Sequence, residues 1–253
     1  MNNSIAELRD ALRQASSIAA LTGAGISAES GVPTFRGPNG LWRNYSPEKL
    51  ATPQAFAENP RLVWEWYDWR RGLIREAQPN AGHVAIAELE RRKSGAADPP
   101  DGLPDHSGFT LITQNVDGLH DRAGSQNILK LHGDLWIVQC TGCGATGPND
   151  EVPLQGDLPP RCRCGAWLRP AVVWFGEPLP AEVWGRAVEA SGRAKVFLVI
   201  GTSAAVYPAA GLAEVARRAG SRLAIVNPEP TPLDQVADWV LRGPSGELLP
   251  RLL

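Results

Sequence analysis

The spacing of the four cysteines gives the clearest chemical signal in the chain. They form two short pairs, Cys140-Thr-Gly-Cys143 and Cys162-Arg-Cys164. Tetrahedral zinc takes four thiolates from two such turns, and a structural site contributes roughly 10–16 kcal/mol of apparent binding energy to folding. The alternative is four reduced thiols without a ligand. Because all four thiols are used, the pattern predicts one structural zinc ion, with a tighter second turn.

A glycine-rich segment, Gly23-Ala-Gly-Ile-Ser-Ala-Glu-Ser-Gly31, follows the apolar run 17–21. Gly23 and Gly25 allow the backbone to approach a pyrophosphate, beside the N–H groups of a starting helix. The third glycine comes only at Gly31, so the spacing departs from the dinucleotide-binding fingerprint. A nucleotide site and a strand-to-helix turn without a ligand both stay open on these residues alone.

His132, in Leu131-His-Gly-Asp134, is the histidine best placed for acid–base chemistry. It directly follows an apolar run, and a neutral imidazole is a natural base near neutral pH. His83, His106 and His120 are its rivals, and His106 falls in a segment that is expected to be a loop. Because His132 directly follows a predicted strand, we expect it, and not the other three histidines, to be the acid–base residue.

Short apolar runs that alternate with helical patterns must position these side chains. The expected strands are 17–21, 109–113, 128–131, 196–200 and 223–226. The expected helices are 5–14, 180–191 and 209–219. The alternation predicts an α/β fold with a doubly wound parallel sheet. Ligands collect at the carboxyl ends of such strands, where the polar segments 114–117, 132–134, 201–203 and 227–229 follow.

Asn115 and Asp117 are the most informative residues of these segments. They are typical of residues that form turns, and they equally suit a site that holds an amide and a ribose hydroxyl. Both interpretations stay open at this point.

Two stretches interrupt the strand and helix pattern. Residues 36–79 are rich in Pro and Trp, and residues 136–170 hold the cysteines. We expect both to form a small lobe, inserted into a large lobe of about residues 1–35, 80–135 and 171–253. Residues 93–108 are rich in Gly, Pro and Asp, which predicts an exposed loop without an assigned function.

Charge and composition exclude several classes of partner. The chain has 253 residues and a formal net charge of -2, so no basic field indicates a nucleic acid or a membrane surface. No apolar run reaches the roughly 18 residues that a membrane span needs. The polar start lacks the pattern of a signal peptide. We expect a cytoplasmic monomer.

The ordered motifs resemble the sirtuins, the family of NAD-dependent protein lysine deacylases. Besides the cysteine pairs, the matching segments are 23–27, 31–37, 113–120, 131–134, 173–177, 201–203 and 227–228. The resemblance implies a single catalytic domain over residues 1–253, with a Rossmann-like large lobe and a small lobe that combines a zinc ribbon with a helical insertion. It also implies a cleft between the lobes that holds NAD and an acyl-lysine of a protein or peptide.

The resemblance also implies the roles of particular residues. His132 is the general base, and Asn115 is the second catalytic residue. Val173, Phe175, Gly176 and Glu177 pair with the substrate backbone as an added strand, with Val206 on the other side. The implied NAD site comprises Gly23, Ala24, Gly25, Ser27, Thr34, Phe35, Arg36, Trp42, Gln114, Asn115, Val116, Asp117, Gly201, Thr202, Ser203, Asn227, Pro228, Glu229 and Ser245.

Tyr67 and Arg70 narrow the expected acyl group. They stand three apart, on one face of a predicted helix. A planar guanidinium and a phenol are a good pair for a carboxylate. The pair is similar to that of sirtuins that remove succinyl and malonyl groups, and Ala51 matches a pocket position where a small residue leaves room. The alternative is an ordinary aromatic side chain and a solvated surface charge.

We therefore expect an NAD-dependent deacylase that prefers succinyl- and malonyl-lysine and has weaker deacetylase activity. The implied products are nicotinamide, O-acyl-ADP-ribose and free lysine, because the acyl group is transferred to a ribose hydroxyl. A chain that is mainly a deacetylase, and one that transfers ADP-ribose to protein or water, are the alternatives within NAD chemistry. A module that senses NAD without catalysis is the third hypothesis.

Overall fold

The computed structural model describes residues 2–34, 47–93 and 108–253. The expectations for Phe35, Arg36, Trp42 and His106 lie outside the described residues, as does that for the loop at 94–107. No helix in the described part of the chain is long and apolar enough to cross a membrane.

A six-stranded parallel sheet in the order β3-β2-β1-β7-β8-β9 forms the centre of the large unit. Its strands are almost wholly apolar because helices cover both faces. The five predicted strands are confirmed within one residue at either end, whereas β9 is an addition. The strands are β1 (Ile18–Thr22), β2 (Phe109–Thr113), β3 (Ile128–Lys130), β7 (Val196–Ile200), β8 (Arg222–Val226) and β9 (Trp239–Leu241).

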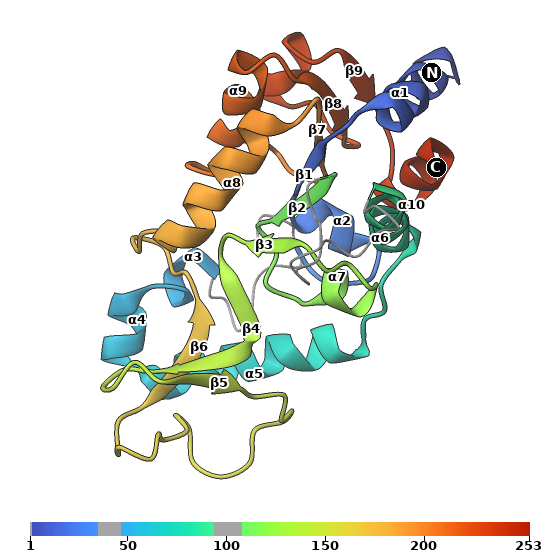
Figure 1. The fold of residues 1–253 in the computed structure, drawn as a ribbon. Helices are drawn as coiled ribbons and strands as arrows, with labels where there is room; N and C mark the ends of the chain where they lie inside the picture. Colours follow the sequence, from blue (N-terminus) through green and yellow to red (C-terminus); the bar gives the residue numbers. More distant parts are fainter. Residues whose placement is uncertain (1, 35–46, 94–107) are drawn as a thin grey trace, which may run out of the picture.

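Alternate side chains of each strand enter two different cores. In β1, Ile18 and Ala20 face one core, and Ala19 and Leu21 face the other, as the two-residue period of a strand requires. The first core is covered by α1 (Asn2–Gln14), α6 (Ala81–Lys93), α10 (Ser245–Leu248) and η3 (Leu249–Leu252). The second is covered by α8 (Ala181–Arg193) and α9 (Gly211–Arg218), on the opposite side of the sheet in Figure 1.

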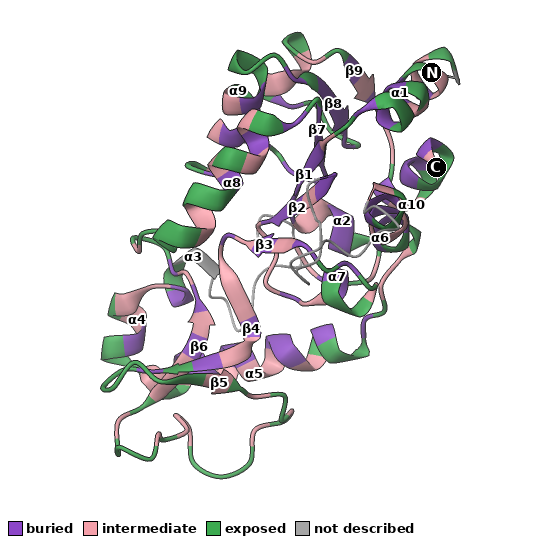
Figure 2. Ribbon diagram, in the orientation of Figure 1, coloured by how far each residue is buried: buried purple, intermediate pink, exposed green. Residues whose placement is uncertain are grey.

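Three further short helices follow strands of this sheet in the chain. They are α2 (Ala24–Ala28), α7 (Leu119–Arg122) and η2 (Pro232–Gln235). The helix after β1 therefore begins at Ala24, inside the glycine segment, and extends for only five residues. Figure 2 shows that β1 and β7 are buried along their length, and β8 is buried after its exposed first residue, Arg222.

A second, antiparallel sheet in the order β5-β4-β6 packs with a group of helices. Its strands are β4 (Gly133–Cys140), β5 (Thr146–Pro148) and β6 (Leu168–Val172), and the helices are α3 (Pro47–Leu50), α4 (Pro53–Glu58) and α5 (Pro60–Glu76). Asn59 caps α5 by accepting a hydrogen bond from the Leu62 N–H at 3.0 Å, and Pro60 occupies the first turn. The predicted fold class, with two sheets and a cysteine cluster, is confirmed. The numerical lobe boundaries stay predictions.

Candidate active site

A cleft of about 1060 Å³ lies between the carboxyl edge of the parallel sheet and the second unit. Its volume exceeds the roughly 300–1,000 Å³ of pockets for drug-sized ligands. One wall follows the ends of β1, β2, β3, β7 and β8, and the other comprises α5 and residues 172–179. Of the residues predicted for NAD, it is lined by Gly23, Ala24, Gly25, Thr34, Gln114, Asn115, Val116, Gly201, Thr202, Ser203, Asn227, Pro228, Glu229 and Ser245.

The glycines of the β1–α2 turn are required by packing. A Cβ at Gly23 would lie 2.7 Å from the Cβ of Thr202, and one at Gly25 would lie 2.6 Å from the carbonyl oxygen of Gly201. Gly201 has a φ of +57°, and a Cβ there would lie 2.4 Å from the Ile26 nitrogen. Two strand-end loops therefore touch at backbone distance and form the floor of the cleft. Close approach of a pyrophosphate to these glycines stays a prediction.

The Asn115 side chain is oriented by two acceptors. Its Nδ2 donates to the Gly23 carbonyl at 3.1 Å and to the Ser27 hydroxyl at 3.2 Å. Among the described residues this leaves its side-chain oxygen for a ligand in the cleft. Such an oxygen is an acceptor for the N–H of a primary amide.

Ser27 and Asp117 lie behind the cleft wall. The Ser27 hydroxyl donates to Oδ2 of Asp117 at 2.8 Å, and the Leu119 N–H donates to Oδ1 at 2.9 Å. Burial raises the pKa of Asp117, and these two donors oppose that shift. The structure therefore places both residues as supports of Asn115 rather than as part of the lining.

His132 lines the cleft with a fixed tautomer. Its Nδ1 lies 3.0 Å from the Gln114 carbonyl oxygen, which only accepts, so Nδ1 carries the proton and Nε2 has the free lone pair. Burial lowers the pKa of His132, so the ring is neutral near pH 7. Gly133 has a φ of +80°, and a Cβ there would lie 2.1 Å from the Ala171 carbonyl oxygen. The turn after the histidine thus requires glycine.

The rival histidines of the described chain pack against each other away from the cleft lining. The ring centroids of His83 and His120 lie 4.8 Å apart, and both side chains are buried. His120 Nε2 lies 3.0 Å from the Thr22 hydroxyl. Burial lowers the pKa of His83 to about 4. Among the described histidines only His132 lines the cleft.

Further hydrogen bonds hold the lining that follows β8 and the lining at α10. The Asn227 side chain donates to the Glu229 carbonyl at 2.7 Å, and Ser245, which also lines the cleft, is buried. The Gly246 N–H lies 3.1 Å from each carboxylate oxygen of Glu29. Sequence reasoning did not single out Glu29, although it lies within the glycine segment.

Tyr67, Arg70 and Ala51 line the opposite wall, as the sequence predicts. Tyr67 is 3% exposed and Arg70 is 5% exposed, so Arg70 is not a solvated surface charge. Its Nη2 donates to the Pro33 carbonyl at 3.5 Å. Burial lowers the pKa of Arg70, and Tyr67 and Asp117 act in the opposite direction.

The segment 173–177 crosses the cleft between two anchors. The Val173 N–H donates to the His132 carbonyl, and the Phe175 N–H donates to the Ala51 carbonyl, both at 2.9 Å. Every residue predicted for substrate contact lines the cleft, including Phe175, Gly176, Glu177 and Val206. The lining also includes Trp184 and Tyr207, which the sequence did not identify. It includes Trp174 as well, which lies inside the predicted segment 173–177 but was not named as a contact residue. The high Trp content was the only signal for Trp184.

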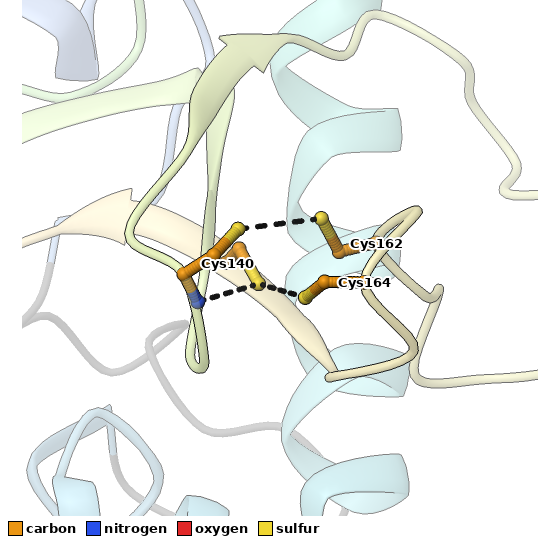
Figure 3. Close-up of side chains that lie close together, drawn as sticks. Cys140, Cys162 and Cys164 are labelled. Atoms are coloured by element: carbon orange, nitrogen blue, oxygen red, sulfur yellow. Dashed lines mark hydrogen bonds between the residues drawn. The ribbon is translucent and has the colours of Figure 1, made fainter.

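The four cysteines come together at the far end of β4 (Figure 3). Their sulfur atoms all lie within 4.8 Å of one another. The sulfur atoms of Cys140 and Cys164 lie 3.4 Å apart, and those of Cys143 and Cys162 lie 3.8 Å apart. Tetrahedral Zn–S bonds of about 2.3 Å require sulfur separations of about 3.8 Å. The donor set fits one structural zinc ion with all four positions filled by protein.

The backbone around Cys140 favours its thiolate form. The N–H groups of Cys143 and Gly142 both point at its sulfur at 3.4 Å. This donation lowers the pKa of the Cys140 thiol. A thiolate is the form that binds zinc.

Known proteins resemble the chain over nearly its whole length. The profile of the Sir2 family matches residues 23–208. An "NAD-dependent protein deacylase 2" from Pyrobaculum aerophilum is 52% identical over 233 residues, which cover 92% of this chain and 88% of that protein. The solved structure of a Sir2 homologue in complex with NAD aligns with a TM-score of 0.88 and 47% identity, over 98% of this chain and 91% of that one.

A second solved structure of similar fold contains a different ligand. It is a mutant Sir2 homologue in complex with 2'-O-acetyl ADP-ribose. It aligns with a TM-score of 0.88 and 46% identity, and it covers 97% of this chain and 94% of that one. The chain described here belongs to the Sir2 family.

Proposed function

We propose that this chain is an NAD-dependent protein-lysine deacylase that prefers succinyl- and malonyl-lysine to acetyl-lysine. The single observation that carries the preference is the buried pair of Arg70 and Tyr67 in the cleft wall, beside the segment 173–177. The deacylase class rests on family membership and on the name of the relative. Proteins or peptides with an acylated lysine are the proposed substrates.

In this proposal, NAD binds at the carboxyl edge of the parallel sheet. The loops at Gly23–Gly25 and Gly201–Ser203 receive the pyrophosphate, and Asn227 to Ser245 receive the adenosine end. The oriented oxygen of Asn115 accepts the N–H of the nicotinamide amide. When bound, NAD supplies a ribose carbon on which the acyl oxygen of the substrate displaces nicotinamide.

His132 has the properties of the general base for the next proton transfer. Its Nε2 lone pair takes the proton of a ribose hydroxyl, which makes that oxygen nucleophilic toward the acyl carbon. The segment 173–177 holds the substrate backbone as an added strand, with Val206 opposite. Attack of that oxygen on the acyl carbon expels the lysine amine, and one water molecule supplies the remaining oxygen and protons, so that the products would be free lysine and O-acyl-ADP-ribose.

The acyl preference follows from a guanidinium that lines the cleft and is screened from water. Arg70 is 5% exposed, and its side chain is part of the cleft wall. A terminal acyl carboxylate that enters the cleft can form a charge-assisted hydrogen bond with this guanidinium. A charge-assisted hydrogen bond contributes about 1.5–3 kcal/mol, which corresponds to roughly 10- to 150-fold in kcat/KM. Acetyl-lysine lacks that carboxylate.

The experiment compares kcat/KM for acetyl-, succinyl- and malonyl-peptides of one sequence. The wild type is expected to use the succinyl peptide at least about tenfold better than the acetyl peptide. Arg70→Met lowers the succinyl value about 10- to 100-fold and changes the acetyl value less than about threefold. Arg75→Met is the matched control, because Arg75 lies on the exposed end of the same helix outside the cleft lining. Equal or better use of acetyl-lysine, unchanged in Arg70→Met, contradicts the preference.

Isotope-labelled NAD checks the deacylase class in the same assay. Label is expected in O-acyl-ADP-ribose, with one nicotinamide released per lysine exposed. Transfer of the label from NAD to protein would instead indicate ADP-ribosyl transfer and would contradict the proposal.

A further inference from the structure

We propose that Trp174 is a positioning residue that directs the hydroxyl proton of Tyr67 toward the end of the acyl chain. The inference rests on the proposed function, because a carboxylate is the ligand that the proton would meet. The indole Nε1 of Trp174 lies 2.8 Å from the Tyr67 hydroxyl oxygen. Each side chain is only 3% exposed, and both residues line the cleft.

The direction of this hydrogen bond is fixed by chemistry. An indole N–H only donates, so the Tyr67 oxygen must accept. The Tyr67 proton therefore points away from Trp174. The neighbouring Arg70 guanidinium has no acceptor to offer. No residue in the described part of the chain accepts the Tyr67 proton, which leaves it for a ligand in the cleft.

The Tyr67 hydroxyl stays protonated in this environment. Burial raises its pKa far above the ordinary value. A neutral phenol beside a guanidinium offers donors of two kinds to one anion, and a phenolate would instead pair with Arg70. The acyl pocket therefore presents a hydrogen-bond donor at Tyr67 across the whole working pH range.

The Trp174 indole is held in place by several contacts. The guanidinium carbon of Arg169 lies 3.3 Å from the centroid of the indole ring. Arg169 is paired with Glu177 through contacts of 2.6 and 2.8 Å, and Glu177 also accepts the Trp174 backbone N–H at 2.8 Å. Phe56 packs beside the ring at a centroid distance of 5.3 Å. A fixed indole gives a fixed direction to the Tyr67 proton.

This hydrogen bond connects the peptide-binding segment with the acyl-binding residue Tyr67, which are distant in sequence. Trp174 lies within the segment proposed to pair with the substrate backbone, whereas Tyr67 lies on α5, 107 residues earlier. The same indole that shapes the peptide-binding segment thus orients the acyl-binding hydroxyl. A Trp174 that only fills space would affect all acyl groups equally, because its ring would contribute nothing to a particular acyl terminus.

The test measures the ratio of kcat/KM for succinyl- and acetyl-peptides in Trp174→Phe, Tyr67→Phe and the double variant. Trp174→Phe keeps an aromatic ring and removes the donor. We expect the ratio to fall about three- to tenfold, mainly through the KM of the succinyl peptide. The double variant should have the same ratio as Tyr67→Phe alone, because Trp174 acts through that hydroxyl.

Trp64→Phe is the matched control for loss of a buried indole donor. Trp64 is fully buried on the same helix as Tyr67, and its Nε1 donates to the Leu168 carbonyl at 2.8 Å. In Trp64→Phe, the ratio of kcat/KM for succinyl- and acetyl-peptides should equal that of the wild type, even if the variant is less stable. The ratio does not depend on the fraction of folded enzyme, so partial unfolding cannot imitate the effect.

A second replacement separates the donor from the shape of the ring. Benzothienylalanine at position 174 keeps a bicyclic ring and places sulfur where the N–H stood. It should lower the ratio as Trp174→Phe does. An unchanged ratio in both replacements, or additive effects in the double variant, would overturn the inference. A wild type without succinyl preference defeats the proposed function instead, and that result is read before any variant is made.

Discussion

His132 presents only one of its two ring nitrogens to the cleft. Nδ1 is bound to the Gln114 carbonyl, so base chemistry falls to Nε2. Asn115 is oriented in the same way, because its two amide protons are used by Gly23 and Ser27. At the scale of the residue, the site is defined by two acceptor atoms that face the cleft, Nε2 of His132 and the side-chain oxygen of Asn115. Both assignments follow from donors and acceptors in different segments of the chain, which follow β1, β2 and β3.

The pH dependence of catalysis should report this histidine. Only neutral His132 accepts a proton, and burial lowers its pKa below the ordinary value of 6.5. We expect kcat/KM to be flat through neutral pH and to fall with acid along a limb whose apparent pKa lies below 6.5. His132→Ala should lower kcat about 10²- to 10⁴-fold and remove the limb. A limb above the ordinary value, or one that persists in the variant, contradicts the role of His132.

Some strands can be predicted from the sequence, whereas others form only because of tertiary contacts. Strands buried on both faces, such as β2 and β7, are continuous apolar runs and were predicted. The strands β5 and β9 were not predicted: each has three residues, and β5 contains Gly and Pro instead of an apolar run. β4 carries a register shift between Asp134 and Val138, which breaks its alternation. Short or irregular strands exist here because a neighbour pairs with them.

The same distinction holds for the site. Residues that directly follow strands were found from the sequence, because parallel strands bring their carboxyl ends to one edge. The contacts of Trp174 with Tyr67 and of Glu29 with Gly246 were not predicted, although both residues lie in predicted segments, since the partners are 107 and 217 residues apart in the sequence. No local pattern reports such a contact. The roles of Tyr67 and Arg70 depended on family resemblance, and their burial is what the structure adds.

The contact between α6 and α7 should make stability sensitive to acid. His83 and His120 are buried as neutral rings, and burial lowers both pKa values, that of His83 to about 4. The unfolded histidines take up protons below pH 6.5 or so, whereas the folded ones resist. Their contribution to stability is therefore complete above the unfolded pKa and is lost as the pH falls toward the folded values.

Thermal unfolding measured between pH 7 and pH 4 tests this contribution. The comparison protein is the double variant His83→Gln, His120→Gln. Between pH 7 and pH 4 the melting temperature of the wild type should decrease by several degrees more than that of this variant. Carboxylate protonation affects both proteins and cancels in the difference. Parallel curves would show that the histidine pair does not couple folding to protons.

At the scale of the whole molecule, β4 connects the base to the metal site. The strand begins at Gly133, next to His132, and ends at Cys140 in the thiol cluster. β6 pairs with it along both ends and continues into the segment 173–177. Zinc bound by the cysteines therefore stabilises the sheet that supports one wall of the cleft. Its role is to hold structure, since no ligand position is open.

Removal of zinc should act through folding rather than through chemistry. A chelator is expected to lower the melting temperature and the activity together, and added zinc should restore both. Near-ultraviolet circular dichroism of the nine tryptophans follows the loss of packing. Activity lost without any change in melting temperature or in this spectrum would indicate a catalytic metal and contradict the structural role.

The preference for carboxylated acyl groups is the central claim for the molecule, and one ratio tests it most directly. That ratio compares kcat/KM for succinyl- and acetyl-peptides of the same sequence, in the wild type and in Arg70→Met. We predict a wild-type ratio of at least about ten that falls to near or below one in the variant. A wild-type ratio of one or less that Arg70→Met leaves unchanged would contradict the account.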